Sequence, residues 1–227
     1  MSLIKHIEPG PFVKICCIGS LDEEDRAISA GAAALGLVSS MPSGPGIIDD
    51  LLIAEIAANV PPSFPTFLLT AFQYADDIIE QHQRCRTSII QLVDRVQQDE
   101  LIRLRTRLPG IKLVQVIHVR NEDSIEEALS VSSFVDAILL DSGNQGLEVK
   151  QLGGTGRVHD WKLSRRISDE LKIPLFLAGG LNKNNVVQAI TSVRPFGLDL
   201  CSGVHTLNKL DDSKLTDFFD ALGQHRQ

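Results

Sequence analysis

The chain has few cysteines, and their spacing does not suit a metal site or a set of disulfides. Cysteine occurs only at positions 16, 17, 85 and 201 of the 227 residues, with no CxxC or CxxH spacing. This pattern argues against a zinc site, and a chain of this length does not need a disulfide framework to fold. We therefore expect a protein that works without a metal ion.

Long apolar runs and an excess of positive charge are also missing. No stretch approaches the roughly 18 apolar residues of a membrane span, and the N-terminal MSLIKHIEPGPF lacks the apolar region of a signal peptide. The formal net charge of −7 argues against nucleic-acid or anionic-membrane partners, because both select basic surfaces. We expect a cytoplasmic protein that holds any anionic ligand with backbone N–H groups or a few placed cations.

What the chain does have is a regular alternation of short apolar runs and helix-period segments. The spacing predicts strands over 12–17, 34–39, 66–71, 88–93, 112–118, 135–141, 173–178 and 197–202. It predicts helices over 21–31, 49–59, 74–84, 97–108, 123–131, 159–171, 182–193 and 212–222, with Asn182 as an N-cap. Eight such units match a (β/α)8 TIM barrel, and we expect residues 1–227 to form one barrel domain. A doubly wound open sheet is the alternative, although its usual GxGxxG turn is absent.

Glycine pairs follow the last two predicted strands. Gly179 and Gly180 come after the seventh strand, and Ser202 and Gly203 come after the eighth. Either pair alone fits an ordinary tight turn equally well. Two such turns are neighbours in a barrel, however, and bare backbone amides at that place commonly bind phosphate. We therefore expect a phosphorylated small-molecule substrate.

Two adjacent thiols end the first predicted strand, and the alternation of a strand directs them to opposite faces. Cys16 shares a face with Lys14, and a lysine favours the polar mouth of a barrel over the layer beneath the helices. Cys17 shares a face with Val13 and Ile15, and we expect it to pack as a small hydrophobe. Cys16 is therefore the thiol predicted to face the barrel interior.

An inward thiol opposite a carboxyl group suggests proton transfer. Asp141 ends the sixth predicted strand, so its side chain is expected to share the barrel mouth with Cys16. A thiolate can take a proton from carbon, while a neutral carboxylic acid can donate one to oxygen. That division requires a lowered pKa for Cys16, which Lys14 would favour, and a pKa of Asp141 raised by burial. Cys201 either lines the barrel or packs in the core, and core packing is the favoured interpretation.

A long polar loop, 142–152, is followed by GGTG at 153–156. Loops of this length are often lids or binding segments, to which Lys150 and Arg157 would add positive charge, and a flexible connector is the alternative. Among the histidines, His118 fits either a pocket or the core. We expect surface positions for three others, His6, His82 and His225.

These residues resemble the phosphoribosylanthranilate isomerase family, whose members are (β/α)8 barrels of tryptophan biosynthesis. VKICCIG at 13–19 is similar to the family's V-K-I-C-G-[IL]-T. Four further stretches resemble family motifs in order and spacing, nearly end to end: AILLDS (137–142), GGTGRVHDW (153–161), LAGGLNKNNVVQAI (177–190) and VRPFGLDLCSGV (193–204).

The resemblance implies an Amadori rearrangement that needs neither metal nor cofactor and opens the ribose of N-(5′-phosphoribosyl)anthranilate to a 1-deoxyribulose. It implies that Cys16 is the general base that removes the C2′ proton and that Asp141 is the general acid that protonates the ring oxygen. Asp199 matches an aspartate that contacts the anthranilate amine. The remaining substrate-binding residues would be Lys14, Gly179, Gly180, Ser202 and Gly203. We expect a monomer or a homodimer.

The chain departs from the family where the aromatic part of the substrate would bind. The family's strand-2 loop F-x-x-x-S-x-R-[YF] reads GLVSSMPSGPGII at 36–48, without arginine, and Val93 replaces the histidine of Q-L-H-G. Losing the arginine removes a charge-assisted contact of roughly 1.5–3 kcal/mol, for which Arg120 or His205 is a geometric substitute. Cys17 stands at the glycine of the first motif. Two alternatives stay open: an isomerase acting on another phosphosugar amine, and a non-catalytic phosphometabolite-binding protein.

Overall fold

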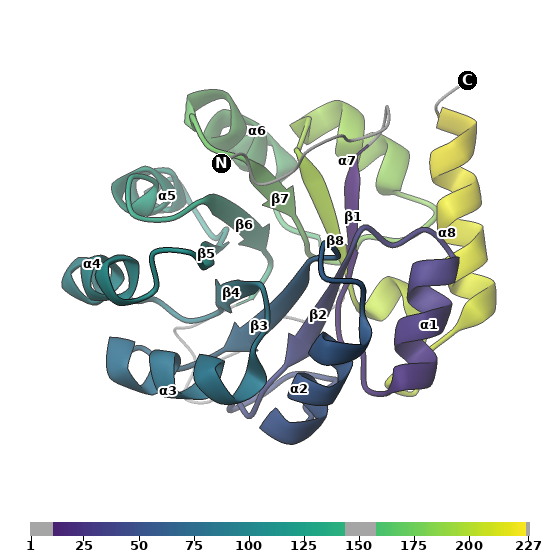
Figure 1. Ribbon diagram of the computed structural model, residues 1–227. Helices are drawn as coiled ribbons and strands as arrows, with labels where there is room; N and C mark the ends of the chain where they lie inside the picture. The colour runs from purple at the N-terminus through teal and green to yellow at the C-terminus, as the bar shows by residue number, and fades with distance from the viewer. Residues whose placement is uncertain (1–10, 144–157, 226–227) are drawn as a thin grey trace.

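The computed structural model describes residues 11–143 and 158–225, and it forms a closed barrel of eight parallel strands inside a ring of helices (Figure 1). The strands are β1 (Phe12–Ile15), β2 (Ala34–Val38), β3 (Thr66–Thr70), β4 (Ile89–Leu92), β5 (Lys112–His118), β6 (Ala137–Asp141), β7 (Leu175–Leu177) and β8 (Gly197–Leu200). The helices are α1 (Leu21–Ser29), α2 (Asp50–Asn59), α3 (Ala75–Cys85), α4 (Gln98–Arg107), α5 (Asp123–Val131), α6 (Trp161–Glu170), α7 (Val186–Val193) and α8 (Asp212–His225). The predicted (β/α)8 TIM barrel is confirmed.

The barrel closes where β1 pairs in parallel with β8, with Lys14 opposite Asp199. After β8 the chain forms a short 3-10 turn, η1 (Ser202–Val204), and a small hairpin of β9 (His205–Thr206) and β10 (Lys209–Leu210). The hairpin therefore stands beside the end of the strand that completes the barrel.

Aromatic side chains fill the amino end of the barrel. The rings of Phe12 and Phe67 each meet the ring of Phe176 edge-on, with centroids 5.7 Å and 6.0 Å apart. Gly197 makes room for them, because a Cβ there would lie 2.6 Å from the Phe176 ring. With this end packed by rings, the polar interior residues gather at the opposite, carboxyl end of the strands.

The seventh helix begins later than the sequence predicts. It starts at Val186, with Asn185 as the preceding residue, so the prediction that Asn182 is its N-cap is wrong. The Asn182 side chain accepts a hydrogen bond from the backbone N–H of Asn184 and donates one to the carbonyl oxygen of Gly180, both about as long as ordinary bonds at 2.9 Å and 3.0 Å. Asn182 therefore braces the turn after β7.

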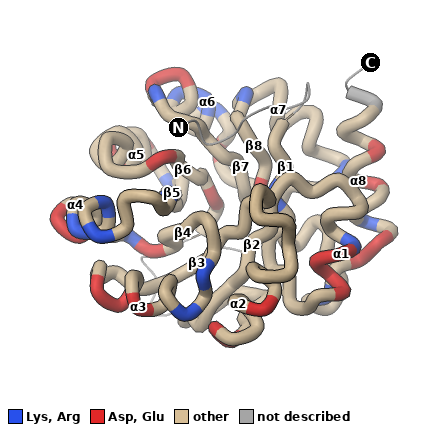
Figure 2. The backbone as a smooth tube through the Cα atoms, in the orientation of Figure 1, with Lys and Arg blue, Asp and Glu red and all other residues tan. Residues whose placement is uncertain are grey.

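Charged residues concentrate on the outer helices, as Figure 2 shows for α1, α3 and α4. His82 does not share this outer position: its side chain is buried, and its Nε2 lies 2.8 Å from the Thr87 carbonyl oxygen. The predicted surface position of His82 is wrong because it lies on the barrel-facing side of α3. His6 and the side chain of His225 lie outside the described part of the chain. Within the described residues no helix has the length and apolar character needed to cross a bilayer.

Candidate active site

A cavity opens at the carboxyl ends of the strands, where the sequence predicted the active site. Six of the predicted site residues line it: Cys16, Asp141, Gly179, Gly180, Asp199 and Ser202. They come from β1, β6, the turn after β7 and the end of β8, segments far apart in the sequence. Lys14 and Gly203 do not belong to this lining.

Cys16 is buried directly after β1, with its thiol against the neighbouring strand β2. A Cβ at Gly36 would lie 2.7 Å from the Cys16 sulfur and 3.0 Å from the Cys16 Cα, closer than such atoms approach in proteins. Glycine at this position of β2 therefore makes the room that the thiol occupies. Gly36 was not among the predicted site residues, although a glycine inside a strand is a signal of close approach.

Cys17 does not continue the alternation of β1. The strand ends at Ile15, and Cys17 has a φ of 66°, a left-handed conformation that glycine adopts more readily. The side chain consequently turns to the cavity and packs in the same inner cluster as Cys16. Cys17 is buried among apolar residues as predicted, but the prediction that it shares the face of Ile15 and Val13 is wrong. The glycine of the similar family motif fits this backbone conformation.

Cys17 forms hydrogen bonds with Cys16 and Cys201, and together with burial they raise the pKa of Cys17 well above its ordinary range. Cys17 therefore keeps its proton at neutral pH and is able to donate it in a hydrogen bond. Cys201 is half-buried and lines the cavity, so the favoured interpretation of a thiol packed in the core is wrong and the alternative holds.

Asp141 ends β6 with a buried side chain that faces the cavity. Burial raises the pKa of its carboxyl group, although the backbone N–H of Ser142 donates a 2.7 Å hydrogen bond to Oδ1 and Lys14 acts in the opposite direction. The raised pKa is what a carboxylic acid needs to carry a proton near neutral pH.

Asp199 is held by a buried lysine. Its Oδ2 lies 3.1 Å from Nζ of Lys14, whereas its Oδ1 is buried and has no hydrogen-bond partner among the described residues. Burial raises the pKa of Asp199, the pairing with Lys14 lowers it, and the nearby Asp141 raises it further. One carboxylate oxygen is thus fixed, and the other remains as an acceptor on the cavity side.

The turn after β7 depends on glycine. Gly179 and Gly180 have φ values of 83° and 63°, in the left-handed region where a side chain is unfavourable. Asn185 and Asn182 both donate to the Gly180 carbonyl oxygen at 3.0 Å, which fixes the turn from its acceptor side. Among the described residues, the N–H groups of the two glycines donate to no other group. The turn can therefore offer two backbone donors to an anion.

Gly203 does not line the cavity, but its lack of a side chain lets two turns pack closely. A Cβ at this position would lie 1.9 Å from the carbonyl oxygen of Leu181, so only glycine lets the turn after β8 approach the turn after β7. Ser202 sits at the junction and lines the cavity. The two glycine-containing turns that the sequence predicted to be neighbours are therefore packed against each other.

The opposite side of the cavity is mostly apolar. It is formed by Val38, Met41, Leu69, Val93 and Val116, with Ser43, Gly44 and Pro45 from the loop after β2. Among the described residues that line the cavity there is no lysine, arginine or histidine. This side therefore provides no cationic side chain for an anionic ligand from the part of the chain that is described.

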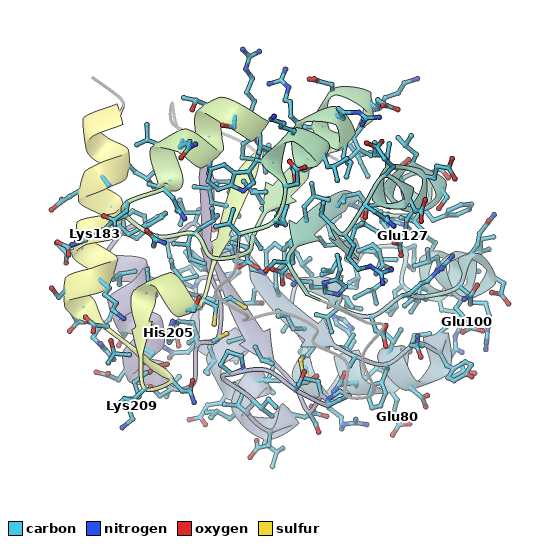
Figure 3. All side chains as sticks on the ribbon, turned by 180° about the vertical axis from the view of Figure 1, so that it is seen from behind. Glu80, Glu100, Glu127, Lys183, His205 and Lys209 are labelled. Atoms are coloured by element: carbon cyan, nitrogen blue, oxygen red, sulfur yellow. The ribbon has the colours of Figure 1, made fainter. Side chains whose placement is uncertain are left out.

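The residues suggested as substitutes for an arginine lie outside this lining. Arg120 is exposed after β5. His205 begins the first strand of the hairpin and Lys209 begins the second, and both are labelled in Figure 3. His205 lines a neighbouring groove with Cys17 and Pro45. His118 is a core residue rather than a pocket residue, because it is buried with its Nε2 3.1 Å from the Val93 carbonyl oxygen. Burial also lowers the pKa of His118.

Part of the predicted site cannot be placed. The loop predicted over 142–152 is described only as far as residue 143, and GGTG, Lys150 and Arg157 lie outside the described residues. In the part that is described, no group of three or more His, Cys, Asp or Glu residues is arranged to hold a metal ion.

Known proteins share both the sequence and the fold. The family model of N-(5′-phosphoribosyl)anthranilate (PRA) isomerase matches residues 13–221. N-(5′-phosphoribosyl)anthranilate isomerase 1 of Methanosarcina mazei is 34% identical over 223 residues, which cover 92% of this chain and 94% of that protein. The crystal structure of phosphoribosyl anthranilate isomerase from Thermotoga maritima has a TM-score of 0.81 and 28% identity, covering 94% of this chain and 99% of that chain. A phosphoribosyl anthranilate isomerase in complex with reduced 1-(o-carboxyphenylamino)-1-deoxyribulose 5-phosphate has a TM-score of 0.78 and 26% identity, with the same coverage of 94% and 99%.

Proposed function

The chain belongs to the N-(5′-phosphoribosyl)anthranilate isomerase family, and from this we propose how its residues divide the reaction. It is an isomerase that converts N-(5′-phosphoribosyl)anthranilate to 1-(2-carboxyphenylamino)-1-deoxyribulose 5-phosphate, a step of tryptophan biosynthesis. The reaction moves protons within one molecule, so it needs groups that give and take protons and no redox partner.

Asp141 acts first, as the general acid. Its proton goes to the ring oxygen of the ribose, the C1′–O bond breaks, and the nitrogen lone pair forms a C1′=N bond. The support for this role is the burial that raises the pKa of the Asp141 carboxyl group, which is the direction that a general acid requires.

Cys16 then acts as the general base. As a thiolate it takes the proton from C2′, the electron pair of that C–H bond forms a C1′=C2′ double bond, and the π pair of the C1′=N bond returns to nitrogen. Protonation at C1′ and loss of the proton from the C2′ hydroxyl group then give the ketone. Cys17 supports this step, because it keeps its proton and can donate an S–H hydrogen bond to the Cys16 sulfur. Cys17 would thus stabilise the thiolate without competing for the substrate proton.

The remaining residues bind and orient the substrate. Asp199 accepts the N–H of the anthranilate amine through Oδ1, the oxygen that has no partner in the described part of the chain. The backbone N–H groups of Gly179 and Gly180, with Ser202, hold the phosphate. Because Cys16 and Asp141 line the same cavity as these anchors, the ribose lies within reach of both.

The cellular setting follows from charge and family. A net charge of −7 supports a protein that does not bind nucleic acid. A cytoplasmic location is proposed because this biosynthetic family acts on a small phosphorylated metabolite. The described cavity lining comes from a single chain, so both a monomer and a homodimer would contain it.

The observation that carries these roles is that Cys16, Asp141 and the glycine turn line one cavity. We expect purified protein to isomerise N-(5′-phosphoribosyl)anthranilate with a kcat/KM of about 10⁴ M⁻¹s⁻¹ or more. Asp141→Asn should lower kcat by roughly 10²–10⁴-fold. It should leave the affinity for inorganic phosphate unchanged. Full activity in this variant would contradict the role of Asp141, and phosphate binding without any turnover by the wild type would favour the phosphometabolite-binding alternative.

A further inference from the structure

Lys14 is a buried ammonium whose hydrogen-bonding capacity is used inside the protein. Its side chain is fully buried in the barrel, beneath the cavity. Nζ donates to Oε1 of Gln91 on β4 and pairs with Oδ2 of Asp199 on β8, 3.1 Å away. Its third side faces the ring of Phe67 on β3, with 4.7 Å from Nζ to the centroid.

This arrangement leaves Lys14 nothing to give to a substrate. An ammonium group has three N–H donors, and an acceptor, a carboxylate and an aromatic face occupy the three directions. Lys14 is also absent from the cavity lining, whereas both of its polar partners, Gln91 and Asp199, belong to it. The sequence-based prediction that Lys14 contacts substrate therefore does not follow from its position.

Two carboxyl groups at the cavity share this single cation. Asp199 touches it, whereas Asp141 feels its charge without direct contact. Two neighbouring carboxyl groups tend not to ionise together, and the one that touches a cation ionises first. Lys14 therefore holds Asp199 by direct contact and acts on Asp141 only through its charge.

We propose that Lys14 and Gln91 are positioning residues for this reaction: Gln91 fixes the Lys14 ammonium, which orients and ionises Asp199 so that its free Oδ1 accepts the substrate amine. The inference rests on the proposed roles of Asp199 and Asp141. Neither Lys14 nor Gln91 touches the reacting atoms in this account. Gln91 is the polar residue of the otherwise apolar strand β4, IIQL, and a polar side chain in such a strand is the sequence signal that could have identified it.

A double-mutant cycle tests the proposal. Lys14→Met removes the ammonium while keeping the length of the chain, and we expect kcat/KM to fall about 100-fold, as when one partner of a buried charge pair is removed. In the Asp199→Asn background the same substitution should change kcat/KM by less than about 3-fold, because the group that Lys14 serves is already gone. Losses that multiply in the double variant would mean that Lys14 acts independently of Asp199, and would overturn the proposal.

A matched control and a second variant separate positioning from folding. Lys112→Met breaks a 2.9 Å pair with Asp136 at the amino end of β5, away from the cavity, and should leave kcat/KM unchanged. Gln91→Leu keeps the charge but removes its acceptor, and should raise KM about tenfold and show the same coupling to Asp199→Asn. An unchanged KM in folded Gln91→Leu protein, or additive losses, would count against the proposal.

The pH profile supplies a readout that a structural role would not move. The titratable groups around Lys14 are Asp199, Asp141 and Cys16, on β8, β6 and the end of β1. Without the ammonium, the carboxyl group of Asp141 should ionise at higher pH, so the alkaline limb of kcat should shift upward in Lys14→Met. An unshifted limb contradicts the proposal, whereas absence of turnover in the wild type would instead overturn the proposed function and, with it, this inference.

Discussion

The two sides of the cavity mouth are built by different means. On the side of β7 and β8 the surface is backbone, turned by Gly179 and Gly180 and brought close by Gly203. On the side of β2 and β4 it consists of side chains, among them Met41 and Val93, and carries no cation within the described lining. The substrate has an anionic group at each end, a phosphate and an aromatic carboxylate. In the proposed binding mode each side of the cavity binds one of these groups, but only the β7–β8 side offers backbone N–H donors for it.

The two sides should respond differently to amino-acid substitutions. A site made of amides and left-handed glycines tolerates no substitution at a few positions, so those positions identify it. A site made of side chains can change its partners one by one while the barrel stays intact. The β7–β8 side is therefore fixed by its backbone geometry, whereas side chains on the β2–β4 side can be exchanged without changing the backbone.

The largest effect is expected at the residue between the two sides. Cys16→Ala removes the general base and should lower kcat by roughly 10²–10⁴-fold, with little change in phosphate affinity. Cys85→Ala is the matched control, because Cys85 is equally buried but lies on α3 in the outer core. Steady-state turnover of both variants gives the comparison, and equal kcat values in the two would rule out Cys16 as the base.

Proton donation gives the next largest effect. Burial raises the pKa of Asp141, and the acid form is lost as pH rises through that value. Turnover limited by this donor should then fall about tenfold per pH unit above the pKa. The Asp141→Asn variant should lose this alkaline limb along with most of its activity. A wild-type kcat that stays constant to the highest pH at which the protein is folded would exclude Asp141 as the donor.

Gly203→Ala should break the backbone-built side. The added Cβ would lie 1.9 Å from the Leu181 carbonyl oxygen, so the two turns must separate. We expect KM to rise on the order of 10–100-fold, since one or two hydrogen bonds to the phosphate are lost or misplaced. Gly223→Ala in α8 is the control, because a Cβ there meets nothing within 4 Å. An unchanged KM in Gly203→Ala would mean that these turns do not hold the phosphate.

Met41→Arg should strengthen the side built from side chains. A guanidinium placed in the loop after β2 offers the substrate carboxylate a charge-assisted contact of roughly 1.5–3 kcal/mol, which is about 10–100-fold in KM. Met41→Leu provides the control for a change of shape without charge. If the arginine variant raises KM, the aromatic end of the substrate does not lie against this loop.

The smallest effect concerns stability, and it separates loss of fold from loss of chemistry. Burial lowers the pKa of His159 to about 4, and no described residue forms a hydrogen bond with either ring nitrogen. As pH falls, the His159 imidazole therefore takes up a proton near pH 6.5 in the unfolded chain but only near pH 4 in the folded chain. Stability from this residue is complete above pH 6.5 and should decline by on the order of 1–3 kcal/mol as pH falls to about 4.

Urea unfolding of the wild type and His159→Phe at pH 7 and pH 5 measures this effect. The variant should lose less stability between the two pH values than the wild type. Parallel losses would show that His159 is not the group responsible.

The barrel was predictable because eight alternating strand–helix units fit few other folds. The two neighbouring glycine turns were predictable because glycine is required there by a left-handed backbone or by a close approach. The conformation of Cys17 was not, since alternation holds only while a strand lasts and β1 ends two residues earlier. The burial of Lys14 was not predictable either, because its partners Gln91 and Asp199 come from strands far away in the sequence. Periodicity along the chain thus predicted the helices and strands. It did not predict side-chain positions that depend on contacts with residues distant in the sequence.

The central claim is that only the β7–β8 side of the cavity has groups suited to an anion. Comparing two substrates, with and without the aromatic carboxylate, tests this claim most directly. The measurement is kcat/KM of the wild type for N-(5′-phosphoribosyl)anthranilate and for the analogue whose ring lacks the carboxylate. The account predicts values within about tenfold of each other, because no cation of the described lining awaits the carboxylate. A preference of several hundredfold for the anthranilate compound would exceed what neutral contacts provide, and would contradict it.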